Sequence, residues 1–150
     1  MAGRFFDQWQ VGDKVAHALT RTVTETDNLL ISTLTHNPQP MHLDAEAAKD
    51  SEFGQILVNS CFTFSLTVGV SVADTTAGSL VANLGFDEVR FPKPVFIGDT
   101  LHFETEVADL RDSKSRPTAG IVTWMHRAMN QRGETVCTMK RSALIHKSPA

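Results

Sequence analysis

One short segment combines a histidine, two amides and two prolines, and it is the first place where this sequence suggests chemistry. It reads His36-Asn37-Pro38-Gln39-Pro40-Met41-His42. The prolines exclude a regular helix and favour an extended loop. An imidazole such as that of His42 is the side chain best suited to proton transfer near neutral pH, while the amide of Asn37 can hold a water molecule but cannot accept its proton. We expect His42 and Asn37 to be catalytic, with Gln39 as a polar neighbour that binds substrate.

The same side chains also have purely structural interpretations. Asn37 is a common residue of Asx turns, and His42 can bond a backbone carbonyl of its own loop. Asp44 precedes Ala45-Glu46-Ala47-Ala48, so it is expected to cap a short helix over residues 45–50 rather than act as a base. The remaining histidines are expected on exposed faces or at chain ends: His17, His36, His102, His126 and His146.

A second polar pair, Asn59-Ser60, stands inside the longest apolar stretch, residues 56–72. Hydroxyl and amide side chains interrupt this stretch too often for a membrane span. Its apolar residues alternate with polar or small ones, which by period alone favours a strand, although Phe62, Leu66 and Val70 also fit one helical face. If the stretch is a helix, Ser60 opens it as an N-cap, and the free N–H groups there could polarise a substrate oxygen.

The other elements follow from periodicity and turn signals. A helix is expected from Thr24 or Thr26 to about Thr35, with Leu29, Leu30 and Leu34 as its apolar face. Strands are expected over residues 14–23, 79–91, 101–107, 118–129 and 134–146, from alternating or β-branched runs between turn residues. A meander is the simplest topology for the second half.

Composition restricts the class of protein. The chain has 150 residues, a net charge of -3 and 21% charged residues, which predicts a single domain over residues 1–150. No block of Lys and Arg appears, so neither a nucleic-acid nor a membrane partner is expected. Cys61 and Cys137 lack metal or redox spacing and are expected to be reduced and buried. The N-terminus lacks a signal-peptide core, so cytoplasm is the expected location.

Two motifs resemble the MaoC-like hydratases and dehydratases. The first is Asn37-Pro38-Gln39-Pro40-Met41-His42-Leu43-Asp44, followed by Phe53-Gly54. The second runs from Val89 to Leu101 and contains Phe91-Pro92-Lys93-Pro94-Val95 and Gly98-Asp99. The resemblance implies an α+β chain with a single hot-dog fold, in which a long central helix is wrapped by a curved antiparallel β-sheet beneath an overhanging loop. It also implies a homodimer or higher homo-oligomer that adds or removes water across the 2,3-bond of a short acyl-CoA.

This sequence departs from the usual family signature at the residues that do the chemistry. Aligned on His42, the family's catalytic aspartate corresponds to Asn37, its asparagine to Gln39, and its His-Gly pair to Asn59-Ser60. Three outcomes are open: His42 acts alone as the base, another carboxylate takes part, or catalysis is lost. The resemblance implies no cofactor beyond the coenzyme A thioester that serves as substrate, and no metal cluster is expected.

A closer resemblance concerns a subgroup associated with mesaconyl-, itaconyl- and beta-methylmalyl-CoA, whose acyl groups are branched C5 dicarboxylates. It is carried by the first motif, from Asn37 to Asp44, and by Thr26-Asp27-Asn28, Val58-Asn59-Ser60 and Ser113-Lys114-Ser115-Arg116-Pro117. The distal carboxylate of such a substrate calls for a cation, and Arg116 or Arg90 is expected to bind it. Arg90 and Lys93 are alternatively expected to face the phosphates of coenzyme A, or solvent alone.

Two other functions remain open at this point. A hot-dog thioesterase would direct water at the thioester carbonyl, but it usually needs a carboxylate base near the start of the central helix, where this chain has Asn59 and Ser60. A non-catalytic acyl-CoA-binding protein would explain the loss of the aspartate at Asn37.

Overall fold

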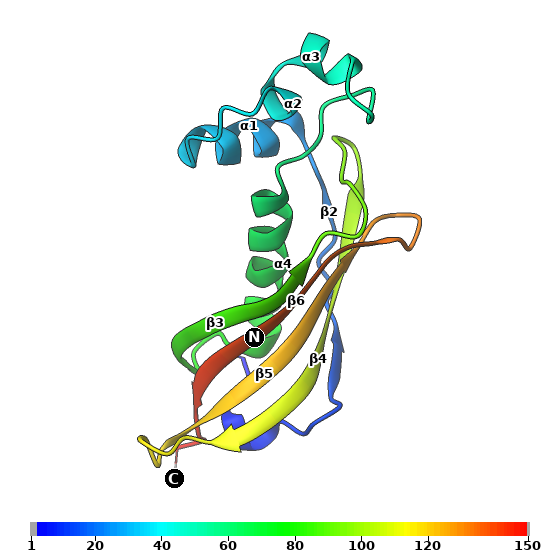
Figure 1. The fold of residues 1–150 in the computed structure, drawn as a ribbon. Helices are drawn as coiled ribbons and strands as arrows, with labels where there is room; N and C mark the ends of the chain where they lie inside the picture. Colours follow the sequence, from blue (N-terminus) through cyan, green and yellow to red (C-terminus); the bar gives the residue numbers. More distant parts are fainter. Residues whose placement is uncertain (1–2, 150) are drawn as a thin grey trace.

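The computed structural model describes residues 3–149, and at their centre one long helix lies against a curved antiparallel sheet (Figure 1). The helix is α4, Ser60–Thr75. Within the described residues the sheet has six strands in the order β1-β4-β5-β6-β3, and β2 also pairs with β4. The expected central helix and curved sheet are confirmed. The strands are β1 Lys14–Ala16, β2 Arg21–Thr22, β3 Leu80–Arg90, β4 Thr100–Asp112, β5 Ala119–Met129 and β6 Thr135–His146.

Strands β4, β5 and β6 form the expected meander. In β4, Leu101, Phe103 and Val107 are buried while His102 and Glu106 are exposed, the two-residue period of a strand with one buried face. Strand β3 departs from the meander, because it pairs with β6 rather than with β4, its neighbour in sequence. The β3–β4 connection contains two prolines, which lack the N–H groups of a tight hairpin ladder, and it carries the chain to the opposite side of the sheet.

The single strand expected over residues 14–23 is wrong in detail, because the segment divides into β1 and β2. Ala16 pairs with Glu104 and Arg21 pairs with Leu101, so five steps along this segment run past only three steps of β4. The extra residues must bulge out of the ladder. The interruption follows His17, whose side chain turns into the core.

Helix α4 confirms the helical interpretation of residues 60–75, against the alternating pattern. Its most buried residues are polar and spaced four apart: Thr63, Thr67, Ser71 and Thr75. The hydroxyls of Thr67 and Thr75 donate to carbonyls one turn earlier, at 2.7 Å in both cases, so they are satisfied without help from the sheet. The larger apolar side chains, Phe62 and Leu66 among them, pack around the edge of the core and stay partly exposed.

Three short helices cover the start of α4 (Figure 1). They are α1 Glu25–Leu34, α2 Pro40–Leu43 and α3 Ala45–Lys49. The expected α1 helix and its cap at Thr24 are confirmed, and Asp44 caps α3 by accepting from two backbone N–H groups. The expected apolar face of α1 is wrong, because Leu29, Leu30 and Leu34 are 52%, 55% and 76% exposed, whereas Asn28 and Ser32 are buried.

Two histidines and one cysteine lie elsewhere than expected. Cys137 is buried, and burial raises the pKa of its thiol to about 11, but Cys61 is exposed. His17 and His126 are buried rather than exposed. His17 contacts Asp74 at 2.7 Å and Thr105 at 2.8 Å, and Thr105 contacts Nδ1 of His126 at 2.8 Å, so hydrogen bonds offset the burial of His17, whereas Nε2 of His126 has no partner among the described residues. No helix within residues 3–149 is long and apolar enough to cross a membrane.

Candidate active site

His42 lies in the short helix α2, so the extended loop expected over residues 36–42 is wrong at its end: Pro40 stands at the start of that helix, where its missing N–H is not needed. One ring nitrogen of His42 is anchored to the backbone. Nδ1 is 2.7 Å from the carbonyl oxygen of Leu57, in the segment just before α4. Because a carbonyl can only accept, Nδ1 must carry the proton, and in the neutral ring Nε2 is then a free base. Nδ1 therefore has the structural role that the sequence also allowed, a bond to a backbone carbonyl. Nε2 remains available for proton transfer.

Asn28 holds the backbone of His42 in position. Its Nδ2 donates to the carbonyl oxygen of His42 at 2.9 Å, and its Oδ1 accepts from the backbone N–H of Asn59 at 2.8 Å. The side chain is only 2% exposed, so neither bond competes strongly with water. Asn28 thus links three segments that are far apart in sequence: α1, the loop of His42 and the start of α4. The sequence alone indicated no individual role for Asn28.

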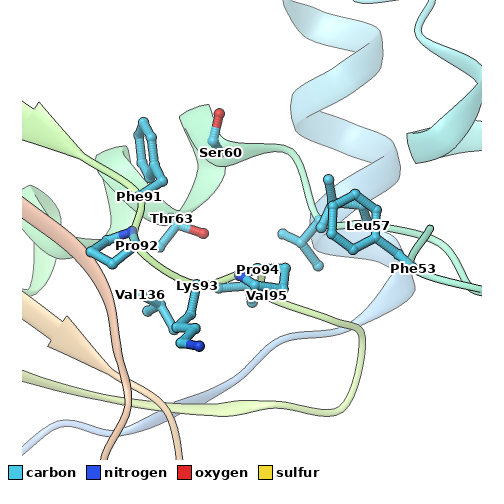
Figure 2. A pocket seen from close by; sticks show the side chains of 11 residues that line it. Phe53, Leu57, Ser60, Thr63, Phe91, Pro92, Lys93, Pro94, Val95 and Val136 are labelled. Atoms are coloured by element: carbon cyan, nitrogen blue, oxygen red, sulfur yellow. The ribbon is translucent and has the colours of Figure 1, made fainter. Parts of the chain in front are cut away.

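Asn59 and Ser60 stand at the start of α4, and the residue that caps the helix is not the expected one. Asn59, not Ser60, is the N-cap, since its Oδ1 accepts from the backbone N–H of Cys61 at 3.0 Å. Its Nδ2 donates to Ser32 at 3.2 Å, so both ends of the buried amide are committed within the protein. Ser60 is exposed, and its hydroxyl stands at the first turn of α4 (Figure 2).

A mostly apolar cavity of about 220 Å³ lies beside this helix start (Figure 2). Its wall combines residues before and within α4 with the proline-rich connection after β3. The lining residues are Phe53, Leu57, Val58, Ser60, Thr63, Phe91, Pro92, Lys93, Pro94, Val95 and Val136. Lys93 is the one titratable side chain among them. The cavity therefore combines an apolar wall, the positive end of a sixteen-residue helix and one cation at its margin.

His42 itself lines a second, smaller cavity of about 50 Å³. Glu25, Asn28 and Leu29 from α1 form part of the same wall, together with Leu43, Ile56 and Ile97. Asn37 is close in sequence, but its Oδ1 accepts from the backbone N–H of Gln39 at 3.0 Å, the Asx turn that sequence also allowed. Gln39 is exposed and directly precedes α2.

The two arginines expected at the site occupy different places. Arg90 ends β3, is exposed, and donates to the carbonyl of Val89 at 2.9 Å. Arg116 lies in the hairpin between β4 and β5, at the opposite end of the sheet from α1, α2 and α3 (Figure 1). A single chain therefore gathers His42, Asn37, Gln39, Asn59 and Ser60 at one end but does not bring Arg116 to them.

The described residues contain no group of three or more His, Cys, Asp or Glu side chains placed to hold a metal ion. The buried His126 is not among the residues that line either cavity; it sits on β5, beside Thr105 of β4 and Arg141 of β6. Burial and the nearby Arg141 lower the pKa of His126 to about 3, so its ring is neutral in the folded chain.

Comparison with known proteins adds the family. Residues 7–128 match the family described as MaoC like domain. The chain belongs to the MaoC-like family. A mesaconyl-CoA hydratase of Cereibacter sphaeroides is 35% identical over 146 residues, which are 97% of this chain and 42% of that protein. This MaoC-like chain thus spans less than half the length of that curated relative.

Solved structures agree on the fold. A MaoC-like dehydratase from Rhodospirillum rubrum has a TM-score of 0.86 at 32% identity, and the match covers 99% of this MaoC-like chain and 100% of that chain. A Mycobacterium tuberculosis protein described as having a double hot-dog fold has a TM-score of 0.88 at 22% identity, covering 98% of this chain and 45% of that one. The expected hot-dog fold is confirmed.

Proposed function

We propose that this MaoC-like chain adds water to, or removes it from, the 2,3-bond of a short enoyl-CoA or 3-hydroxyacyl-CoA thioester. The observation that carries the proposal is the geometry of His42, whose Nδ1 is fixed on the Leu57 carbonyl so that Nε2 is free for proton transfer. The family membership and the mesaconyl-CoA hydratase relative support the same reaction. His42 is the proposed acid-base residue, and Asn37 the residue that orients water.

The thioester is proposed to lie in the cavity beside Ser60. The positive end of α4 would stabilise the enolate-like charge that develops on the thioester oxygen, while the N–H groups of Cys61 and Phe62 are already bonded to Asn59. The apolar wall built by Phe53, Phe91 and Pro94 suits a short acyl chain. Asn59 contributes by holding the helix start in place, and Gln39 is proposed as a polar neighbour of the bound substrate.

The acyl group is proposed to be a branched C5 dicarboxylate such as the mesaconyl group. The relative named a mesaconyl-CoA hydratase supports this choice. Lys93 is proposed as the cation that binds the distal carboxylate, because it lines the cavity. Arg90 is proposed for the coenzyme A phosphates, and Arg116 could contribute to a site only from another copy of the chain.

The thioesterase alternative lacks its base in this geometry. Direct attack of water on the thioester carbonyl needs a carboxylate close to the start of α4. No Asp or Glu lines the cavity there within residues 3–149. Hydration at the alkene, with proton transfer through His42, is the better supported reaction.

The chain is also proposed to act at least as a homodimer. Strand β3 pairs only with β6 among the described residues, and its Leu80 and Leu84 are 42% and 51% exposed. An open, apolar strand edge is normally covered, and a two-fold partner covers it most simply. Light scattering after gel filtration should give at least twice the chain mass; a monomer at micromolar concentration would contradict the proposal. We propose the cytoplasm as the location of the reaction, because unpaired thiols such as Cys61 persist there.

The deciding experiment follows the loss of absorbance of the conjugated enoyl thioester with crotonyl-, mesaconyl- and itaconyl-CoA. The native protein is compared with His42→Ala and with His36→Asn, which changes an exposed histidine of the same loop and tolerates its positive φ of 53°. Turnover that His42→Ala abolishes and His36→Asn retains supports the proposal. Tight binding of these thioesters without turnover would instead identify a non-catalytic acyl-CoA-binding protein, and release of free coenzyme A would identify a thioesterase.

A further inference from the structure

Asn37 occupies the position at which the resemblance expects a catalytic aspartate, and an amide cannot take a proton from water. A water molecule that adds to an alkene must lose a proton, and a negative charge beside His42 would stabilise the imidazolium that forms when the ring takes it. We propose, given the hydratase function above, that Glu25 of helix α1 supplies this charge and is a second catalytic residue.

The first support is the small cavity that His42 lines. Among the described residues of its wall, Glu25 and His42 are the two titratable ones, and the rest are Asn28 and apolar side chains. Its volume of about 50 Å³ exceeds the roughly 30 Å³ that one water molecule occupies in the liquid. A carboxylate and an imidazole therefore share the wall of a space that fits a single water.

The second support is the way α1 is fixed. Glu25 and Asn28 are three residues apart in one helix, so they lie on the same face. The side chain of Asn28 bonds the backbone carbonyl of His42 at 2.9 Å and is almost fully buried. The face of α1 that carries Glu25 is thereby held against the helix that carries His42.

The third support is that the Glu25 carboxylate is uncommitted. The neighbouring Asp27 accepts from Arg21 and from Thr24, and so completes the helix cap. Glu25, in contrast, makes no hydrogen bond and no ion pair with any other residue from 3 to 149. Its negative charge is available to a water or to an imidazolium.

The proposed hydration moves one proton from water to the Glu25–His42 pair and then to C2. The water oxygen forms a bond to C3 of the enoyl thioester while its proton passes to the pair formed by Glu25 and His42. The π electrons of the C2–C3 bond move toward C2 and the thioester oxygen, giving an enolate. The pair then returns the proton to C2, which leaves the 3-hydroxyacyl thioester and restores both residues. Dehydration is the same sequence in reverse.

The test compares kcat and KM of the native chain, Glu25→Gln, Asn37→Asp and the double variant, using the thioester that turns over fastest. Glu46→Gln is the matched control, because Glu46 lies on the neighbouring helix α3 and is exposed. Glu25→Gln should lower kcat by about 100-fold or more with little change in KM, as expected for a lost acid-base group. Asn37→Asp should restore much of that loss in the double variant, because it restores the carboxylate that the resemblance expects at this position.

The outcomes separate this inference from the function it rests on. A native enzyme that turns over, with Glu25→Gln within about threefold of it, would overturn the role of Glu25 and leave the hydratase intact. An inactive native chain that Asn37→Asp activates would show that no carboxylate reaches His42 in the native protein, which also rejects Glu25. If the native chain and Asn37→Asp are both inactive on every thioester, the proposed function fails, and the inference fails with it.

Discussion

Asn28 offers the sharpest test of how the site is built, because one small side chain joins three segments. Asn28→Ala removes the donor to the His42 carbonyl and the acceptor for the Asn59 N–H, at 2.9 and 2.8 Å. Leaving a buried donor without a partner costs about 1–3 kcal/mol, and losing the bond to a partly exposed carbonyl costs about 0.5–1.5 kcal/mol. We expect Asn28→Ala to lower the free energy of unfolding by about 2–4 kcal/mol.

The assay is urea unfolding at a fixed protein concentration, since self-association would shift the midpoint. Leu34→Ala is the matched control on the same helix, because Leu34 is 76% exposed and alanine keeps helix propensity, so a change within about 0.5 kcal/mol is expected. Asn28→Asp keeps the acceptor, but its carboxylate cannot donate to the His42 carbonyl, so it should also destabilise. If Asn28→Ala is no more destabilising than Leu34→Ala, the side chain does not join these segments in solution.

Three further predictions concern a helix cap, a buried histidine and the thiols. Asp44→Ala should destabilise by about 1 kcal/mol in thermal unfolding, because it removes the cap of α3, whereas Asp44→Ser should recover most of the loss. The pKa of His126 is about 3 in the folded chain and roughly 6.5 in the unfolded chain, so only the unfolded chain takes up a proton there as pH falls toward 5. The free energy of unfolding should therefore decrease by about 2 kcal/mol between pH 7 and pH 5. An equal loss in His126→Gln would refute that assignment. A thiol reagent should label Cys61 in the folded protein and reach Cys137 only on unfolding; labelling of both at equal rates would contradict the buried position of Cys137.

Several local signals in the sequence predicted the structure correctly where neighbouring residues decide it. The cap at Asp44, the cap at Thr24 and the alternation of β4 depend on bonds and contacts within a few residues, or on a period set by the backbone. The family resemblance supplied the hot-dog fold. The expectation that His42 and Asn37 carry the chemistry remains a prediction, as does the single domain over residues 1–150.

The buried faces of α1 and α4 were not predicted, because an apolar stripe in the sequence does not indicate which face of a helix packs against the rest of the chain. In α4 the buried stripe consists of small hydroxyl residues whose side chains bond their own helix, and the larger apolar residues stay at the margin. In α1 the leucines face outward and Asn28 faces inward. Hydrophobicity alone predicts the opposite for α1, because it counts the burial of an amide as a cost and does not see the partners that satisfy both of its ends.

The sequence by itself determined the main strands, the caps at Thr24 and Asp44 and the short polar segment that carries His42. Only the tertiary structure decided which residues meet there. Asn28 and Asn59 are 31 residues apart, and His17 and Asp74 are 57 apart, yet each pair is in hydrogen-bond contact. The chain also separates Arg116 from His42 and brings Glu25 to the same cavity. The physical reason is that propensity acts over a few residues, whereas these pairings follow from how the sheet curves around α4 and which polar groups must be satisfied once buried.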